Sequence, residues 1–106
     1  MANSYVVGAL VRVSSYGGTI ANPTLGYRDI NGNLIDPTTV TLIYRDGLGN
    51  RTSVTYPAAP IVKDGVGLYH ADLDTTGKIG NWDYEWTSTG TGQAANKNSF
   101  QVIPGV

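Results

Sequence analysis

Large aromatic side chains at every second position near the end of the chain constrain its fold more than any other feature. Trp82, Tyr84 and Trp86 alternate with polar residues. Successive side chains on a β-strand point to opposite faces of the sheet, so these three rings share one face. Rings of this size need a deep apolar layer to pack against, and a second sheet supplies one. The segment therefore predicts a β-sandwich, and by itself it indicates no chemistry.

The residues just before this strand predict another strand of the same kind. Tyr69, Ala71 and Leu73 alternate with polar side chains after the turn sequence Asp64-Gly65-Val66-Gly67. We expect the two strands to pair in antiparallel fashion across a Gly-rich turn and to contribute to one core. Trp82 or Trp86 should occupy its centre. The expected core residues are Tyr69, Trp82, Tyr84, Trp86, Leu42 and Phe100.

The rest of the chain consists of short alternating runs separated by turn signals. Asn31-Gly32 and the run Asp46–Asn50 are typical of hairpin turns, because Asn, Asp and Gly tolerate positive φ. Pro57 and Pro60 prevent ladder pairing and release the chain from the sheet. About seven to nine antiparallel strands without a helical period predict an all-β fold. Further strands are expected at Tyr5–Val13, Thr24–Ile30, Leu34–Ile35, Val40–Arg45, Arg51–Tyr56, Ile61–Lys63 and Asn98–Ile103.

Length, charge and composition narrow the class of protein. The 106 residues are expected to form a single domain, residues 1–106. The chain has no cysteine, which fits folding in a reducing cytosol. The formal net charge is −1 without a basic cluster, which argues against a nucleic-acid partner. The N-terminus lacks a basic segment and no apolar stretch could span a bilayer, so we expect a complete gene product without a signal peptide or membrane partner.

Few residues are candidates for chemistry. His70 is the only histidine, and its position between Tyr69 and Ala71 places it on the solvent face. A single histidine without cysteine does not make a zinc site. The chain contains no nucleophile elbow, P-loop or dinucleotide fingerprint. We therefore predict no catalytic residue, no cofactor and no metal.

The densest carboxylates lie on the two strands around the Gly-rich turn. If these strands pair, Asp72 or Asp74 would approach Asp83 or Glu85, as in a glycosidase pair or part of a calcium site. The simpler interpretation, which we favour, is a solvated outer face that hinders aggregation. The run Asp29–Asn33 resembles the start of a calcium loop but lacks the later Glu, and a hairpin turn explains it.

Four segments together resemble a known family: Tyr5–Ser15, Asp36–Leu42, Lys63–Leu73 and Gly80–Trp86. Their pattern is similar to that of bacterial-type immunoglobulin-like domains encoded as small stand-alone proteins among the structural genes of tailed bacteriophages and prophages. The resemblance covers most of the chain, and its motifs are fold-forming rather than catalytic. It implies an immunoglobulin-like β-sandwich in which Gly67 turns the chain so that Tyr69 enters the core, much like a tyrosine corner.

The resemblance also implies a function. We expect a non-enzymatic virion protein, synthesised in the cytoplasm of a bacterial host, that decorates the capsid; a place on the tail or at the head–tail junction is the alternative. Its partners would be other virion proteins or further copies of the chain. The strand Val6–Val13 offers an edge for such pairing. The expected partner edge is Val6, Val7, Leu10 and Val11.

Two other classes of function remain open at this point. A carbohydrate-binding or adhesion module for a host-surface glycan needs two or three exposed aromatic side chains in line. Tyr16, Tyr27, Tyr44 and Tyr56 are the residues that could supply them. A small hydrolase would use the four carboxylates of the Gly-rich turn region and would need a cleft to hold its substrate.

Overall fold

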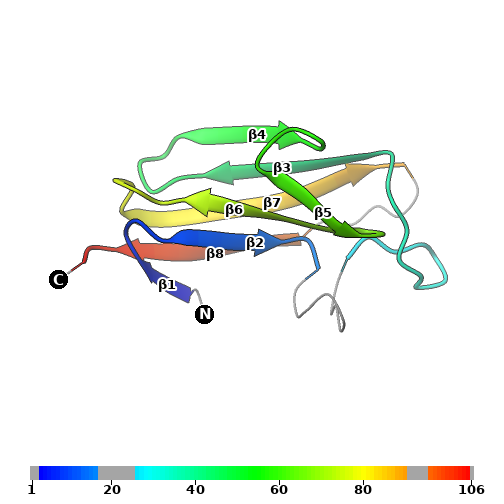
Figure 1. Ribbon diagram of the computed structural model, residues 1–106, viewed down its shortest axis with the longest axis horizontal. Helices are drawn as coiled ribbons and strands as arrows, with labels where there is room; N and C mark the ends of the chain where they lie inside the picture. The colour runs from blue at the N-terminus through cyan, green and yellow to red at the C-terminus, as the bar shows by residue number, and fades with distance from the viewer. Residues whose placement is uncertain (1–2, 17–25, 91–95, 106) are drawn as a thin grey trace.

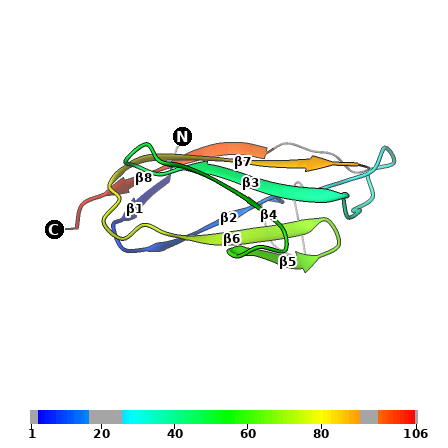
Figure 2. The ribbon, with the colours of Figure 1, turned by 90° about the horizontal axis from the view of Figure 1, so that it is seen from above.

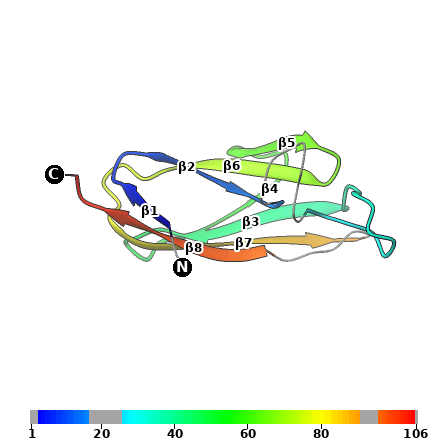
Figure 3. The same cartoon turned by 90° about the horizontal axis from the view of Figure 1, so that it is seen from below.

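The computed structural model describes residues 3–16, 26–90 and 96–105, and these residues form an all-β fold of eight strands. The strands stack in two layers, a five-stranded sheet in the order β1-β8-β7-β3-β4 and a three-stranded sheet in the order β2-β6-β5 (Figures 1, 2 and 3). The predicted β-sandwich is thus confirmed. The strands are β1 (Asn3–Val6), β2 (Leu10–Ser14), β3 (Thr39–Arg45), β4 (Arg51–Thr55), β5 (Ile61–Gly65), β6 (Leu68–Asp74), β7 (Gly80–Thr89) and β8 (Asn96–Ile103).

The expected strand Tyr5–Val13 is broken in two, and this prediction was wrong. The chain turns at Gly8, whose φ is +96°, and passes from the five-stranded to the three-stranded sheet. Fully buried Thr75 holds the turn, because its hydroxyl donates to Ala9 O at 2.7 Å and accepts from Gly8 N at 3.1 Å. β1, which precedes this turn, runs parallel to β8, so the expectation of antiparallel strands fails for that pair.

The expected hairpin between the strands of Tyr69 and Trp82 is also absent. β6 pairs with β2 and β5, whereas β7 pairs with β3 and β8 in the other sheet. Each strand has one apolar face, and opposite layers allow the two faces to meet in one core. The Gly-rich connection between them therefore crosses from layer to layer (Figure 2).

The chain between residues 26 and 38 is less regular than the sequence predicts. Residues 24 and 25 of the expected strand Thr24–Ile30 lie outside the described residues. The remainder contributes one isolated bridge, Arg28 to Leu34, which also replaces the expected short strand at Leu34–Ile35. By contrast, the predicted strand Val40–Arg45 and the hairpin that follows it are confirmed, because β3 pairs with β4 across the expected loop.

The core lies between the two layers. Of the six residues expected there, five are buried, and Tyr84 is partly buried against the same cluster. The Trp82 ring stacks on Phe100, with centroids 5.5 Å apart, and its Nε1 donates to Lys78 O at 2.9 Å. Trp86 is completely buried, but its Nε1 has no hydrogen-bond acceptor among the described residues. Both indoles therefore occupy the centre, with only one of them satisfied.

Candidate functional site

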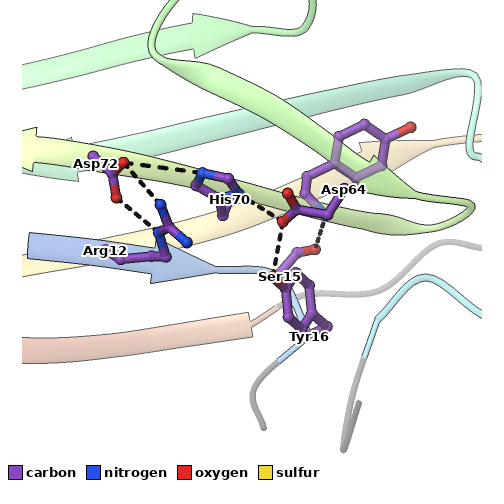
Figure 4. A network of polar contacts seen from close by, with 7 residues as sticks. Arg12, Ser15, Tyr16, Asp64, His70 and Asp72 are labelled. Carbon is purple, nitrogen blue, oxygen red and sulfur yellow. Dashed lines mark hydrogen bonds and ion pairs between the residues drawn. The ribbon is translucent and has the colours of Figure 1, made fainter. Parts of the chain in front are cut away.

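A polar network on the outer face of the three-stranded sheet joins five side chains (Figure 4). His70 Nδ1 lies 2.6 Å from Asp64 Oδ2, and the Tyr16 hydroxyl donates to that same oxygen at 2.8 Å. His70 Nε2 lies 4.0 Å from Asp72 Oδ2. Arg12 donates to both oxygens of Asp72, from Nε at 2.9 Å and from Nη2 at 3.2 Å. The network thereby connects β2, β6 and β5.

The expectation that His70 faces solvent was wrong, since only 7% of the residue is exposed. The alternation was right in one respect: Tyr69 and Ala71 face the core, and His70 faces the opposite side. However, β6 is the middle strand of its sheet, and the ladders place Ser14 and Val62 on either side of His70. The ring therefore lies between two flanking strands, and Asp64 of β5 contacts it. The alternation of β6 alone could not reveal these neighbours.

Each ionisable side chain of the network has a partner within the network. The hydrogen bond from Arg12 lowers the pKa of Asp72, so that this carboxylate stays ionised near neutral pH. Burial, together with the hydrogen bond to Asp64, raises the pKa of Tyr16 to about 12. One ring nitrogen of His70 contacts Asp64 and the other faces Asp72, so neither is directed at a substrate. This arrangement stabilises three strands and offers no free acid, base or nucleophile.

The four carboxylates considered for catalysis do not come together. Asp72 and Asp74 lie on β6 in the three-stranded sheet, whereas Asp83 and Glu85 lie on β7 in the five-stranded sheet. The apolar core separates the two strands, because each turns its apolar face inward. The expected approach of these two pairs was therefore wrong, and a glycosidase pair built across them is geometrically excluded. Within the described residues no group of three or more His, Cys, Asp or Glu side chains is placed to hold a metal ion.

The loop that resembles the start of a calcium site is closed by its own backbone. Asp29 Oδ1 accepts hydrogen bonds from Asn31 N at 2.9 Å and Asn33 N at 3.0 Å. The β3–β4 loop repeats the arrangement, with Asp46 Oδ1 accepting from the amides of residues 48 and 50. Burial tends to raise the pKa of Asp46, but these amide hydrogen bonds outweigh it and lower the pKa. Both carboxylates therefore serve as turn-closing groups.

Asp36 is a polar centre that the sequence analysis did not identify. It accepts hydrogen bonds from Lys63 Nζ at 2.7 Å, Gly67 N at 2.9 Å and the Tyr69 hydroxyl at 3.2 Å. Gly67 has a φ of +71°, and a Cβ there would lie 2.7 Å from Tyr27 O. Tyr69 thus enters the core after a sharp turn, as expected. Its hydroxyl binds a distant carboxylate, however, and not the nearby upstream backbone of a tyrosine corner.

The aromatic residues do not form an exposed row. All ten aromatic residues of the chain lie within the described segments. Tyr56, at 38%, is the most exposed of the ten. Tyr16 and Tyr27 are buried, and Tyr44 stacks in the core on Trp82 with centroids 6.3 Å apart. The glycan-binding alternative therefore lacks the aligned aromatic platform that it requires.

The residues expected to form a partner edge divide into two groups. β1 and β2 are both edge strands, each paired on one side only. Val6 and Leu10 are 53% and 69% exposed, whereas Val7 is partly buried and Val11 is buried. Val6 and Leu10 can therefore contact a partner, and Val7 and Val11 cannot do so through their side chains.

A shallow hollow of about 190 Å³ lies on the outer face of the five-stranded sheet. Charged side chains from four strands surround it, and the sequence analysis did not single it out. The charged residues at its border are Arg45, Arg51, Asp83, Glu85 and Lys97.

Comparison with known proteins gives no family assignment: no protein-family model, curated protein or solved structure matches the chain. Within the described residues there is also no helix long and apolar enough to cross a membrane.

Proposed function

We propose that the chain is an immunoglobulin-like, non-enzymatic component of a tailed-phage virion that docks on other virion proteins. Decoration of the head is the first assignment, and a place on the tail or at the head–tail junction is the alternative. The resemblance of four sequence segments to stand-alone phage domains supports the origin. The evidence for a docking role comes from the arrangement of the strands.

The strand order supports an immunoglobulin-like topology. In immunoglobulin domains strands B, E and D are neighbours in one sheet, and G, F, C and, in variable-type domains, C′ are neighbours in the other. The orders β2-β6-β5 and β8-β7-β3-β4 correspond to these two sets in chain order. Both buried tryptophans lie on β7, the counterpart of strand F. The buried tryptophan of antibody domains lies on strand C, so this core uses a different position for its large rings.

The site geometry supports a binding role without catalysis. The four carboxylates considered for catalysis lie on the outer faces of opposite sheets. Both ring nitrogens of His70 face carboxylates of its own network. Catalytic sites need a cleft with converging polar groups that are free to act. The hollow on the five-stranded sheet is shallow, and the residues at its border are exposed or partly exposed. Binding through surfaces and edges is therefore the better use of this scaffold.

The single observation that carries the docking role is the open edge formed by β1 and β2. These two strands lie on the same side of the sandwich, and each has one unpaired side (Figure 3). Val6 and Leu10 expose apolar surface there. Unpaired strand edges are sites where another chain can add a strand. At the opposite edge of the smaller sheet, a bulge between Lys63 and Gly65 interrupts β5 and hinders such pairing.

Co-sedimentation with particles of the phage or prophage that encodes the chain tests the proposal. The wild-type protein should pellet with particles, and virion mass spectrometry should detect it. The double variant Val6→Lys/Leu10→Lys should lose binding, because two charges would be buried at the contact. Val62→Lys is the matched control, since Val62 is 49% exposed on the β5 edge. Cryo-electron microscopy of the particles then distinguishes head from tail.

Absence of the protein from every purified particle would refute the virion role. Equal binding by the double variant and the control would refute the docking edge while leaving the virion role intact. A glycan array then becomes the next experiment, because host-surface adhesion by some means other than an aligned aromatic platform is the alternative that is left.

A further inference from the structure

Charged side chains of both signs gather on the outer face of the five-stranded sheet. The ladders place Arg51 opposite Arg45, and Arg45 opposite Asp83, so these residues follow one another across β4, β3 and β7. In the next row Glu85 lies opposite Lys97 on β8. The face therefore carries positive residues on β4 and β3, negative residues on β7 and a positive residue on β8. All five side chains border the hollow of about 190 Å³.

These five charged side chains lack close partners of opposite charge among the described residues. Like charges directly opposite each other destabilise a strand pair, and Arg45 faces Arg51 in this way. Across the described part of the chain, none of the five side chains forms an ion pair within 4.0 Å. Arg12 on the opposite sheet, by contrast, is engaged with both oxygens of Asp72. A ligand at the hollow would thus supply counter-charges that the chain itself does not.

The arrangement selects one class of ligand. Two adjacent guanidinium groups fit a carboxylate, to which arginine can donate two parallel hydrogen bonds. Asp83 and Glu85 lie one strand further, where they would repel the next charge of a polyanion such as nucleic acid. The same carboxylates would attract an ammonium or guanidinium group. The ligand must therefore carry one acidic and one basic group at a fixed distance.

The distance follows from the sheet. Neighbouring strands lie about 4.8 Å apart, so the point midway between Arg51 and Arg45 is about 7 Å from Asp83. Residues i and i+2 of an extended chain are about 6.7 Å apart and point to the same side. We infer that this face binds an extended segment of a partner protein that carries an acidic residue and, two positions away, a basic residue. The segment would cross the strands, its acid on the arginine pair and its base on the β7 carboxylates.

A peptide titration followed by ¹⁵N–¹H NMR tests this inference at low ionic strength. The probe is a capped peptide with the central sequence Glu-Ser-Lys, and the comparison peptides carry Glu-Ser-Glu, Lys-Ser-Lys and Glu-Lys-Ser. The first should shift the amide signals around Arg45, Arg51 and Asp83 and bind roughly fivefold more tightly than the others, as two exposed ion pairs allow. Added salt should weaken its binding.

Variants locate the interaction. Arg45→Gln/Arg51→Gln should remove the preference for the acidic–basic peptide, and both side chains are exposed or half-exposed, so the fold should persist. Arg12→Gln removes a comparable charge from the opposite sheet and should leave the titration unchanged. Equal shifts by all four peptides, shifts elsewhere, or an undiminished preference in the double variant would overturn the inference.

The inference adds a second contact surface, separate from the β1–β2 edge, to the docking role proposed above, and it rests on that role for its biological setting. Particle co-sedimentation separates the two. If wild-type protein binds particles and the arginine double variant binds equally well, this inference fails and the proposed function stands. If wild-type protein does not bind particles, the proposed function fails, and the peptide titration still decides whether the face recognises an acidic–basic segment.

Discussion

The two buried tryptophans should respond differently to the same substitution, because only one of them has a hydrogen-bond acceptor. Trp82 and Trp86 are both at most 1% exposed. Trp82 Nε1 donates to Lys78 O at 2.9 Å, whereas Trp86 Nε1 has no acceptor among the described residues. Replacing either residue with Phe removes a similar amount of apolar surface. The difference between the two variants therefore isolates the contribution of the indole N–H.

The magnitudes can be estimated from the change in size. Phe buries about 40 Å² less surface than Trp, which costs about 1 kcal/mol at roughly 25 cal/mol per Å². The residual cavity of about 40 Å³ adds about 1 kcal/mol. Trp82→Phe also loses a hydrogen bond worth about 1 kcal/mol, for a total near 3 kcal/mol. Trp86→Phe loses the same packing, about 2 kcal/mol, but removes an unsatisfied donor that costs about 1–3 kcal/mol, so its net cost should lie between about −1 and +1 kcal/mol.

Urea denaturation followed by far-ultraviolet circular dichroism measures both free energies of unfolding. This probe is independent of tryptophan fluorescence, which both substitutions change. The Trp86→Phe variant is expected to be more stable than Trp82→Phe by about 2 to 4 kcal/mol. A Trp86→Phe variant that loses as much stability as Trp82→Phe would refute the reasoning, because it would mean that the Trp86 N–H carries no penalty in the native core.

Three further substitutions test the polar centre and the turns. The hydrogen bond from Lys63 holds the pKa of Asp36 below its ordinary value. The stabilisation from this carboxylate is therefore present above the ordinary carboxyl pKa and is lost as the pH falls through the lowered value. Asp36→Asn should cost about 1 kcal/mol or less at pH 7, after allowance for solvent screening, and should flatten the acid side of a curve of stability against pH. Gly67→Ala should cost at least about 2 kcal/mol in urea melts, because the added Cβ would meet backbone atoms. Gly32 also has a positive φ but has open space around it, so Gly32→Ala should cost about 1 kcal/mol. Equal costs for the two variants would exclude the steric clash at Gly67. Thr75→Val should cost about 2 kcal/mol, because Gly8 N–H in the β1–β2 turn loses its acceptor, whereas Ala9 O keeps the hydrogen bond from Thr75 N at 3.3 Å. Thr75→Ser should retain most of the stability, and a neutral Val variant would show that water replaces the hydroxyl.

Alternation along each strand could be read correctly from the sequence because it is a local property. Even where the predicted strand Tyr5–Val13 breaks, Val11 and Val13 face inward and Val6 and Leu10 face outward. The Asp46–Asn50 hairpin was equally predictable, since its turn depends on an Asp side chain and glycines within five residues.

The candidate site was much less predictable than the fold. His70 was placed on the correct face, but its burial depends on Ser14 and Val62, which are close only after β2 and β5 have paired with β6. The hollow on the other sheet requires β4, β3, β7 and β8 to lie side by side in one register. Asp36 likewise acquires its partners from a turn about thirty residues later in the chain.

By itself the sequence determined that this chain forms strands, which side of each strand is apolar, and where the tight turns lie. Those properties depend on steric and hydrophobic preferences of neighbouring residues. Only the tertiary structure decided which sheet each strand joins. A strand with one apolar face can bury that face equally well in two positions. It can pair with the next strand in a hairpin, or it can lie across the core from that strand in the other sheet. For β6 and β7 the second arrangement prevailed, because it brings the apolar face of Tyr69 and Leu73 against that of Trp82 and Trp86.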